Sequence, residues 1–113
     1  HLHYLALASG VAAEIEAASV PLLPDAEMLA EAGEVPGGTR SNERFLGSRV
    51  TFNPAVQPAR RTLLCDAQTS GGLLLAVPCP SLPRLLDALH SEGEIGVVIG
   101  SLTAGRPGQI TVR

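Results

Sequence analysis

The chain has 113 residues, of which 45% are hydrophobic and 17% charged, a composition typical of one globular domain and unlike that of a disordered segment. Its net charge of -3 argues against a nucleic-acid partner, because such a surface needs a basic patch. Its longest apolar stretch is far too short to cross a membrane, so no membrane partner is expected. The core must be aliphatic, since the chain holds no Trp, one Tyr and two Phe.

The first third of the chain predicts a helix, a strand and a second helix. Apolar residues share one helical face within residues 1–8, and Gly10 is a suitable terminator. Residues 11–15 alternate in a way that predicts a half-buried strand. Asp25–Ala32 predicts a helix with its first residue as the N-cap and Gly33 as its terminator.

A glycine-rich stretch follows, Val35-Pro36-Gly37-Gly38-Thr39-Arg40-Ser41-Asn42. Its two glycines could present free backbone N–H groups to an anion, with Thr39 as the cap of a short helix that continues to Phe45. The spacing matches neither the Walker pattern nor the dinucleotide fingerprint. A plain Gly-Gly turn that leads into a helix cap explains the same residues equally well, so both interpretations stay open.

The middle of the chain predicts a short strand over residues 48–52, closed by Asn53-Pro54, and one or two helical turns over residues 58–66. Arg60 and Arg61 lie in this helical segment. They could bind a phosphate, but a solvated helix face is the favoured interpretation for this pair.

A second glycine-rich stretch, Asp66–Gly72, leads directly into the apolar residues 73–77. The apolar residues have the length of a buried strand, and a polar turn at the mouth of such a strand suits a ligand site or a domain contact. A loop that is tight only to fit its neighbours accounts for the same pattern, and we favour this structural interpretation on the residues alone. Asp66 is expected to accept hydrogen bonds from neighbouring backbone N–H groups.

The last part of the chain predicts a helix over Ser81–Gly93, with its first residue as the N-cap, followed by strands over residues 95–102 and 109–113. Arg106-Pro107-Gly108 between the two strands predicts a hairpin turn. With residues 73–77, the order is strand, helix, strand, strand, and the crossover should be right-handed. The predicted fold is therefore α+β, with a mixed β-sheet and helices packed on it.

The residues alone predict no catalytic group and no metal site. His1, His3 and His90 do not lie near a nucleophile in the sequence, and the chain has no lysine. Cys65 and Cys79 are too far apart for a metal-ligand spacing. Two buried free thiols are the favoured interpretation over a disulfide.

Leu63–Pro78, which contains Asp66-Ala67-Gln68-Thr69-Ser70-Gly71-Gly72, resembles the C-terminal signature of selenide, water dikinase, also called selenophosphate synthetase. His1-Leu2 matches the end of the family's Gly-His-Leu motif. Two departures are Ala67, where the family usually has proline, and His3–Leu5. Three further stretches agree with the family in the same order: Ser9–Ile15, Pro21–Pro24 and Val35–Asn42. The family shares a superfamily with aminoimidazole ribonucleotide synthetase.

The resemblance implies that residues 1–113 form a single C-terminal domain with partial ferredoxin-like topology. In the family, the reactive Cys or selenocysteine, the catalytic lysine and the metal-binding aspartates belong to an N-terminal ATP-binding domain, so no catalytic or metal role is carried onto this sequence. The domain alone is expected to be inactive and to bind no cofactor. The full-length enzyme would be a cytoplasmic homodimer that uses ATP and Mg²⁺. It would make selenophosphate from selenide and water, with AMP and phosphate as products, for selenocysteine and selenium-modified tRNA.

The resemblance also suggests how the domain meets its own N-terminal partner domain. We expect both glycine-rich turns to face a cleft between the domains and to hold phosphate or exclude water there. The residues expected to bind the nucleotide in this way are Gly37, Gly38, Thr39, Asn42, Gln68, Thr69, Ser70, Gly71 and Gly72. In the competing interpretation, the two turns only build the contact between the domains.

Two other functions fit the sequence less well. One is the C-terminal domain of another ATP-dependent enzyme of the same superfamily, against which the Gln68–Gly72 motif argues. The other, from a different class, is a free-standing ferredoxin-like binding or dimerisation module without catalysis.

Overall fold

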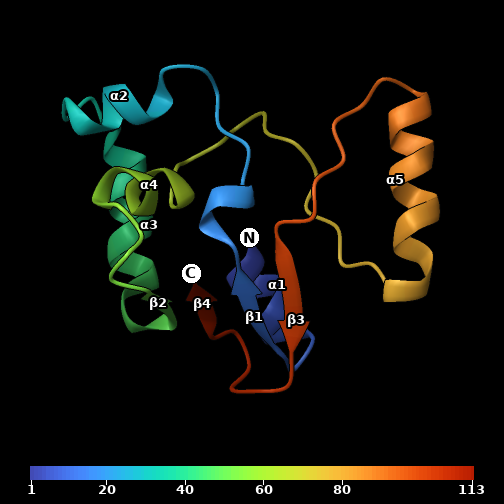
Figure 1. Cartoon of the computed structure of the whole chain (residues 1–113). Coiled ribbons are helices and arrows are strands. Elements are labelled where there is room, and N and C mark those ends of the chain that lie inside the picture. Colours follow the sequence, from blue (N-terminus) through green and yellow to red (C-terminus); the bar gives the residue numbers. More distant parts are fainter.

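The computed structural model describes all residues from 1 to 113 and places its four strands in one sheet (Figure 1). The helices are α1 (Leu2–Ala8), α2 (Ala26–Glu31), α3 (Gly37–Leu46), α4 (Pro58–Leu64) and α5 (Leu82–Ser91). The strands are β1 (Ala12–Ile15), β2 (Val50–Phe52), β3 (Gly100–Thr103) and β4 (Ile110–Val112). The short 3₁₀ helices are η1 (Ala17–Ser19), η2 (Gly47–Arg49) and η3 (Cys79–Ser81).

The sheet is mixed and has the order β2-β4-β1-β3. β4 lies parallel to both β1 and β2, so that Ile110 is paired with Ala13 on one side and with Val50 on the other. β1 and β3 are antiparallel, with Ala13 opposite Leu102. The predicted α+β class with a mixed sheet is confirmed.

A small apolar core lies where β1 and β4 meet η1. Its buried members are Ala13, Ile15, Ala17, Val56, Ile110 and Val112. Alternation along a strand puts Ala13 and Ile15 on one face of β1, and the register with β4 extends this face across Ile110 and Val112. No aromatic ring of Phe or Tyr is buried, so the predicted aliphatic core is confirmed.

The helices of the first half begin and end close to their predicted positions. Gly10 and Gly33 follow α1 and α2 with φ of 68° and 86°, a region that glycine enters without steric cost. Asp25 precedes α2 but makes no side-chain cap, because its own φ of 63° departs from the extended conformation that a capping residue needs. Ser81 likewise precedes α5 without a side-chain cap. The two predicted capping bonds are therefore absent.

The strand predicted at residues 73–77 is wrong. This segment is extended without a strand partner, and the side chain of Leu73 is 89% exposed. The strand predicted at residues 95–102 is wrong at its start, since β3 begins only at Gly100 and Ile95 is 82% exposed. β1 is already flanked by β3 and β4, so the middle of the sheet has no position for another apolar strand.

The predicted hairpin around residues 106–108 is also wrong. A short turn does connect β3 to β4, and Gly108 gives it a φ of 76°. The two strands are not paired, however, because β1 lies between them. The turn therefore passes the end of β1, so that β3 and β4 lie on opposite sides of β1.

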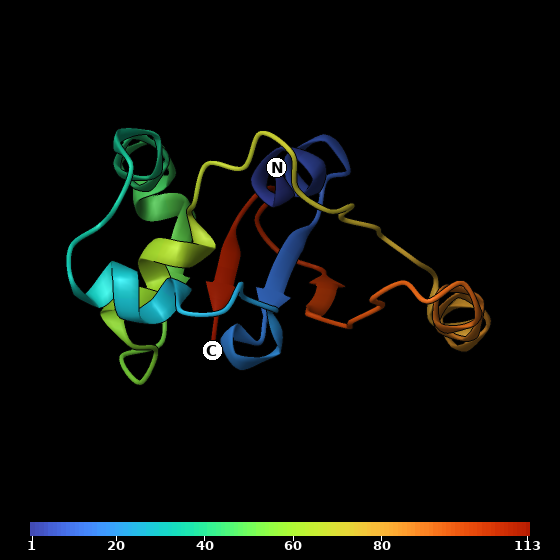
Figure 2. The same cartoon turned by 90° about the horizontal axis from the view of Figure 1, so that it is seen from above.

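The helices lie in separate groups around the sheet. Figures 1 and 2 both show α2, α3 and α4 gathered beside β2, and α5 standing apart beyond β3. α5 packs on its own flanking segment, where a Cβ at Gly96 would lie 3.0 Å from Leu89. None of the helices has both the length and the apolar character to span a bilayer.

Candidate functional site at the start of α3

The first glycine-rich stretch is the first turn of a helix. Pro36 is the N-cap of α3, and Gly37 and Gly38 are its first residues, so Thr39 lies inside the helix and is not the predicted cap. The first N–H groups of a helix have no partner within it. The N–H groups of Gly37 and Gly38 accordingly donate no hydrogen bond in the structure, and both residues are exposed. These two groups are available to an acceptor from outside.

Polar side chains of α3 join this turn to the second glycine-rich stretch. The hydroxyl of Thr39, which is 1% exposed, donates a hydrogen bond to Oδ1 of Asp66. Nδ2 of Asn42 donates to the carbonyl oxygen of Cys65 at 3.0 Å. The backbones also approach closely, because a Cβ at Gly38 would lie 3.0 Å from the Cβ of Ala67. We call these contacts the α3 junction.

The α3 junction changes the role of Asp66. Its carboxylate accepts from the Thr39 side chain and from no neighbouring backbone N–H group, so the predicted local turn bonds are absent. The hydroxyl belongs to Thr39 of α3, which lies 27 residues before Asp66 in the chain. A buried donor and a carboxylate make a stronger hydrogen bond than two neutral groups do, which favours this long-range partner.

The remaining predicted site residues, Gln68–Gly72, form an exposed bend directly after the α3 junction. Their N–H groups make no backbone hydrogen bond. A Cβ at Gly71 would lie 2.6 Å from Oε1 of Gln68, which is the end of an exposed, flexible side chain that can move away. A Cβ at Gly72 would meet nothing within 4 Å. The structure thus brings the two glycine-rich stretches together through their flanks, and it leaves N–H groups of both unpaired.

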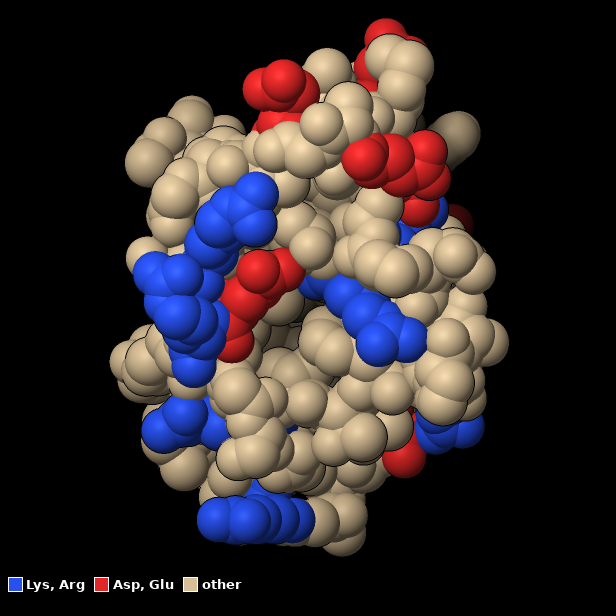
Figure 3. All heavy atoms as spheres, turned by 90° about the vertical axis from the view of Figure 1, so that its left-hand side faces the viewer, with Lys and Arg blue, Asp and Glu red and all other residues tan.

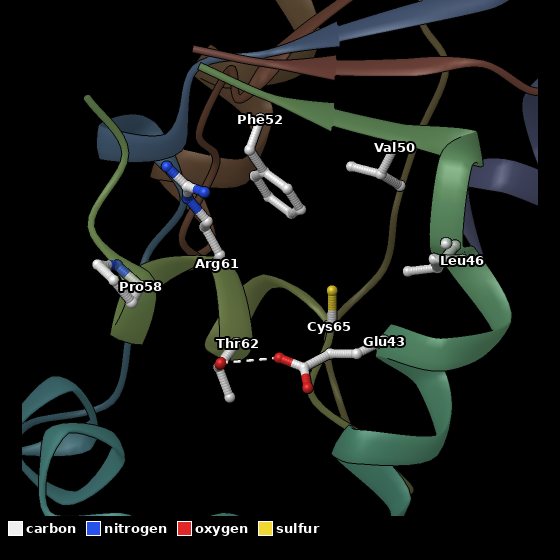
Figure 4. A pocket seen from close by; sticks show the side chains of 9 residues that line it. Glu43, Leu46, Val50, Phe52, Pro58, Arg61, Thr62 and Cys65 are labelled. Atoms are coloured by element: carbon white, nitrogen blue, oxygen red, sulfur yellow. Dashed lines mark hydrogen bonds between the residues drawn. The ribbon is translucent and has the colours of Figure 1, made fainter. Parts of the chain in front are cut away.

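A cavity of about 310 Å³ lies on the other side of the same helix pair, between α3, β2 and α4 (Figure 4). It is lined by Glu43, Leu46, Gly47, Val50, Phe52, Pro58, Arg61, Thr62 and Cys65. Oγ1 of Thr62 donates to Oε1 of Glu43 at 2.7 Å. Figure 3 shows this face of the molecule as hollowed, with acidic and basic side chains at the edge of the hollow.

Cys65 lies at this cavity and is buried, whereas Cys79 is exposed on η3; both thiols are free. The predicted buried free thiol is therefore confirmed for Cys65 and wrong for Cys79, which belongs to the segment that the sheet does not cover. Burial raises the pKa of the Cys65 thiol above its ordinary value of 9.0, and the negative charge of Glu43 raises it further. Such a thiol stays protonated near neutral pH and is a poor nucleophile.

Arg60 and Arg61 neither form a solvated helix face nor point to a free phosphate site. Arg60 pairs with Glu27 at 2.9 Å and donates to the carbonyl oxygen of Val20 at 3.0 Å. Arg61 lies over the ring of Phe52, with its guanidinium carbon 5.6 Å from the ring centroid. The same guanidinium donates to three carbonyl oxygens, those of Val56, Asn53 and Pro54. Both arginines hold α4 to its neighbours.

The chain itself offers no full ligand set for a metal ion. No three His, Cys, Asp or Glu side chains lie close enough together to coordinate one. His3 is buried and bonds through Nδ1 to the carbonyl oxygen of Gly108 at 2.8 Å, and His90 is exposed near the end of α5. The Mg²⁺ that the family resemblance implies therefore does not fit a site within these residues.

Comparison with characterised proteins identifies the family. The chain is 37% identical over 108 residues to the selenide, water dikinase of Myxococcus xanthus, and the match covers 96% of this chain and 31% of that protein. It is 45% identical over 115 residues to the selenide, water dikinase of Bordetella bronchiseptica, with 99% and 32% covered. The chain is homologous to selenide, water dikinase. No family model matches the chain.

The chain spans about a third of the length of the selenide, water dikinases that it matches. The match to the enzyme of Pelobacter propionicus agrees, with 42% identity over 103 residues and 30% of that protein covered. The resemblance inferred from the two glycine-rich stretches is thereby confirmed as homology. The homology extends through both stretches, since it covers 99% of this chain in the Bordetella comparison.

Sequence reasoning missed Glu43 and Thr62, which line the cavity beside the α3 junction. The missing signal was the spacing of Thr39, Asn42 and Glu43, which at i, i+3 and i+4 form one polar stripe on a helix. The sequence predicted that the helix begins at Thr39, with that residue as its cap. The polar stripe was therefore not recognised as the face of α3 that contacts α4 and the residues that follow α4.

Proposed function

We propose that this chain is the C-terminal domain of a selenide, water dikinase, which makes selenophosphate from selenide, ATP and water and releases AMP and phosphate. The observation that carries the proposal is homology over nearly the whole chain to proteins of that name, of which the chain spans about a third. We place the full-length protein in the cytoplasm as a homodimer that uses Mg²⁺, with the metal and the reacting groups held by its N-terminal domain.

The role that we propose for this domain is to supply one wall of the active-site cleft. The α3 junction brings the exposed N–H groups of Gly37 and Gly38 near the exposed bend at Gln68–Gly72. Unpaired N–H groups at a helix start favour a negatively charged partner, since the helix dipole adds to their own partial charge. Phosphate oxygens of the nucleotide are suitable acceptors, and the same wall limits the access of bulk water to the cleft.

Within this proposal, Thr39 and Asn42 are positioning residues. Their side-chain groups are engaged with Asp66 and with the carbonyl oxygen of Cys65, so they hold the two glycine-rich stretches in place and leave substrate contact to backbone N–H groups. No residue of the chain is assigned a catalytic role. The chain alone should accordingly have no dikinase activity.

Activity measurements on two proteins test the assignment. The full-length protein that contains this chain should convert selenide and ATP into selenophosphate, detected by ³¹P NMR, with one AMP formed per selenophosphate. The isolated chain should form neither product above the rate without protein. Selenophosphate formation by the isolated chain, or its absence from the full-length protein, would contradict the proposal.

Two glycine substitutions in the full-length protein separate a cleft wall from a mere domain contact. Gly37→Ala and Gly72→Ala each add one methyl group where nothing lies within 4 Å in this structure, so the domain itself should fold unchanged. A cleft role predicts a raised KM for ATP or a lowered kcat, with an unchanged midpoint of urea unfolding. Unchanged kinetics with lowered stability would assign both turns to the domain contact alone. Ser101→Ala, on the exposed edge strand β3, is the control.

A further inference from the structure

A second concave site lies away from the α3 junction, between α1, the end of α3 and the turn before β4. It encloses about 390 Å³, a volume within the range of small-ligand pockets. Its lining includes His3, Tyr4, Phe45, Arg49, Arg106 and Gln109. We call this site the aromatic cleft. It draws on three segments that are distant in the sequence and that only the fold brings together.

Aromatic rings form one side of the aromatic cleft. Tyr4 and Phe45 are stacked, with ring centroids 5.8 Å apart and an angle of 30° between the ring planes. The ring of His3 lies 5.4 Å from Tyr4 and 6.0 Å from Phe45. Tyr4 is nevertheless 59% exposed and Phe45 44% exposed, in a chain with only three Phe and Tyr residues in all. Two of these three rings therefore form an exposed stacking surface.

The charge of the aromatic cleft is positive, although the whole chain carries -3. Arg49 and Arg106 line it, and no Asp or Glu does. Neither arginine forms an ion pair, whereas Arg60 and Arg113 both pair with carboxylates. The guanidinium of Arg49 lies 5.0 Å from the centroid of Phe45, so it is placed beside the stacked rings. Nη1 of Arg49 donates to the carbonyl oxygen of Phe45, but the other N–H groups of Arg49 and those of Arg106 have no acidic neighbour in the cleft. These groups suit an anionic ligand.

The buried base of the aromatic cleft is held in place by a specific contact. The carbonyl oxygen of Gly108 can only accept, so Nδ1 of His3 carries the hydrogen in their 2.8 Å bond. A Cβ at Gly108 would lie 2.9 Å from Cε1 of His3, so only glycine fits there. Gln109 uses its amide nitrogen on the carbonyl oxygen of Ser48 at 3.2 Å, which leaves its Oε1 free to accept. The cleft thus offers a free acceptor beside its aromatic rings.

We propose that the aromatic cleft binds a nucleoside monophosphate. The base stacks on the exposed face of Tyr4, Oε1 of Gln109 accepts from an amino group of the base, and Arg49 and Arg106 bind the phosphate. Stacking on an aromatic ring and charge-assisted bonds from arginine are the two interactions that such a ligand offers together. The residues of the aromatic cleft all belong to this chain, and none of them belongs to the α3 junction described above.

Calorimetric titration of the 113-residue chain with AMP, with adenosine and with inorganic phosphate tests this site. AMP should bind saturably at one site per chain, and more tightly than either adenosine or phosphate. Tyr4 is the only tyrosine, so its ring signals in a ¹H–¹³C NMR spectrum are unambiguous and should shift upfield as the base stacks. Equal affinity for AMP and inorganic phosphate would overturn the proposal, because the rings would then contribute nothing.

Variants complete the test. Tyr4→Ala should weaken AMP binding by about 5- to 150-fold, the range for one stacked base, and Tyr4→Phe should restore it. Arg106→Gln should weaken AMP binding by about tenfold or more and leave adenosine binding unchanged. Arg84→Gln, an exposed arginine on α5 outside the aromatic cleft, is the matched control. All four variants change exposed side chains, at three positions, so folding should persist, and equal affinities across the four variants would overturn the proposal.

Discussion

The hydroxyl of Thr39 donates a hydrogen bond to the carboxylate of Asp66, and this contact ties the first turn of α3 to the residues after α4. Thr39 is also the largest side chain that is completely buried. In a domain with such a small aliphatic core, a buried polar contact between the first turn of α3 and the residues after α4 helps to stabilise the fold. The relative position of the two glycine-rich stretches therefore depends in part on this hydroxyl group, together with the bond from Asn42 to the carbonyl oxygen of Cys65.

Removal of that hydroxyl should destabilise the fold. Thr39→Val keeps the shape of the side chain but leaves the Asp66 carboxylate without its donor, so we expect a loss of about 1–3 kcal/mol in the free energy of unfolding. Urea unfolding followed by circular dichroism measures it. Thr39→Ser should retain most of the stability, and Thr69→Val, at an exposed threonine without a hydrogen-bond partner, should change little. Equal stability of the Thr39 and Thr69 variants would show that the contact contributes nothing.

A pair of glycines with similar backbone angles should respond differently to a methyl group. Gly33 and Gly108 have φ of 86° and 76°, so alanine at either position carries the cost of a left-handed residue, about 1–2 kcal/mol. Gly33→Ala meets no atom within 4 Å, whereas Gly108→Ala would lie 2.9 Å from the ring of His3. We expect Gly108→Ala to be more destabilising by about 1–3 kcal/mol. Similar melting temperatures for the two variants would contradict the close approach to His3.

Arg61 should be irreplaceable by lysine. Its guanidinium donates to three carbonyl oxygens and lies over Phe52, which a single ammonium group cannot reproduce. We expect Arg61→Lys to lower the free energy of unfolding by about 1.5–3 kcal/mol. Arg84→Lys, on exposed α5, supplies the baseline for an arginine-to-lysine change. If both variants unfold at the same denaturant concentration, Arg61 does not hold the loop before α4.

The two cysteines should differ in reactivity and in their effect at alkaline pH. Cys79 is exposed, whereas burial and Glu43 raise the pKa of Cys65, so iodoacetamide at pH 8 should modify Cys79 first, as mass spectrometry of peptides can show. A raised pKa in the folded chain means that the unfolded chain ionises first. The stability associated with the Cys65 thiol is therefore complete below pH 9.0 and is lost as pH rises through the folded pKa.

This pH dependence can be isolated with a variant. The stability difference between the unmodified chain and Cys65→Ala should be constant up to about pH 8 and should shrink at higher pH, when measured by urea unfolding under reducing conditions. Cys79→Ala, which removes the exposed free thiol, is the matched control variant. A difference that grows with pH would mean that the Cys65 thiolate is stabilised in the fold.

The apolar segments outside the sheet should make the isolated chain prone to self-association. Leu73 and Ile95 lie on the two segments that flank α5 and are largely exposed, and such patches bind other apolar surfaces. We expect the chain to bind 8-anilinonaphthalene-1-sulfonate and to self-associate at high concentration. The double variant Leu73→Lys and Ile95→Lys should lower dye binding without lowering the free energy of unfolding. A large loss of stability in that variant would show that these side chains are buried in solution.

The first half of the chain could be predicted from its sequence because its signals are local. Gly10 and Gly33 end their helices through their own backbone conformation, which does not depend on distant contacts. The alternation at residues 11–15 requires only one neighbouring strand to form a strand. The family could be predicted for a similar reason. Its signature depends on short stretches such as Asp66–Gly72, and such stretches can be recognised from their residues alone, without knowledge of their contacts in the fold.

The errors concern relations between distant segments. The apolar residues 73–77 have the composition of a buried strand, but β3 and β4 already occupy both sides of β1. These residues pair with neither edge strand of the sheet, β2 or β3. The bond from Thr39 to Asp66 and the contact of Glu43 with Thr62 join segments 27 and 19 residues apart. No single-sequence pattern specifies such partners, so the α3 junction could not be predicted, although both of its halves were singled out.

The position of β4 has a consequence for synthesis of the chain on the ribosome. β4 is the strand that joins β2 to β1, and it follows every other element in the chain. Until residues 110–112 emerge from the exit tunnel, a nascent chain therefore carries the paired strands β1 and β3 and the single strand β2, all with unpaired edges. Such edges promote pairing with other chains. We expect ribosome-bound chains halted before β4 to be sensitive to protease and to recruit chaperones, and release of a few further residues to abolish both.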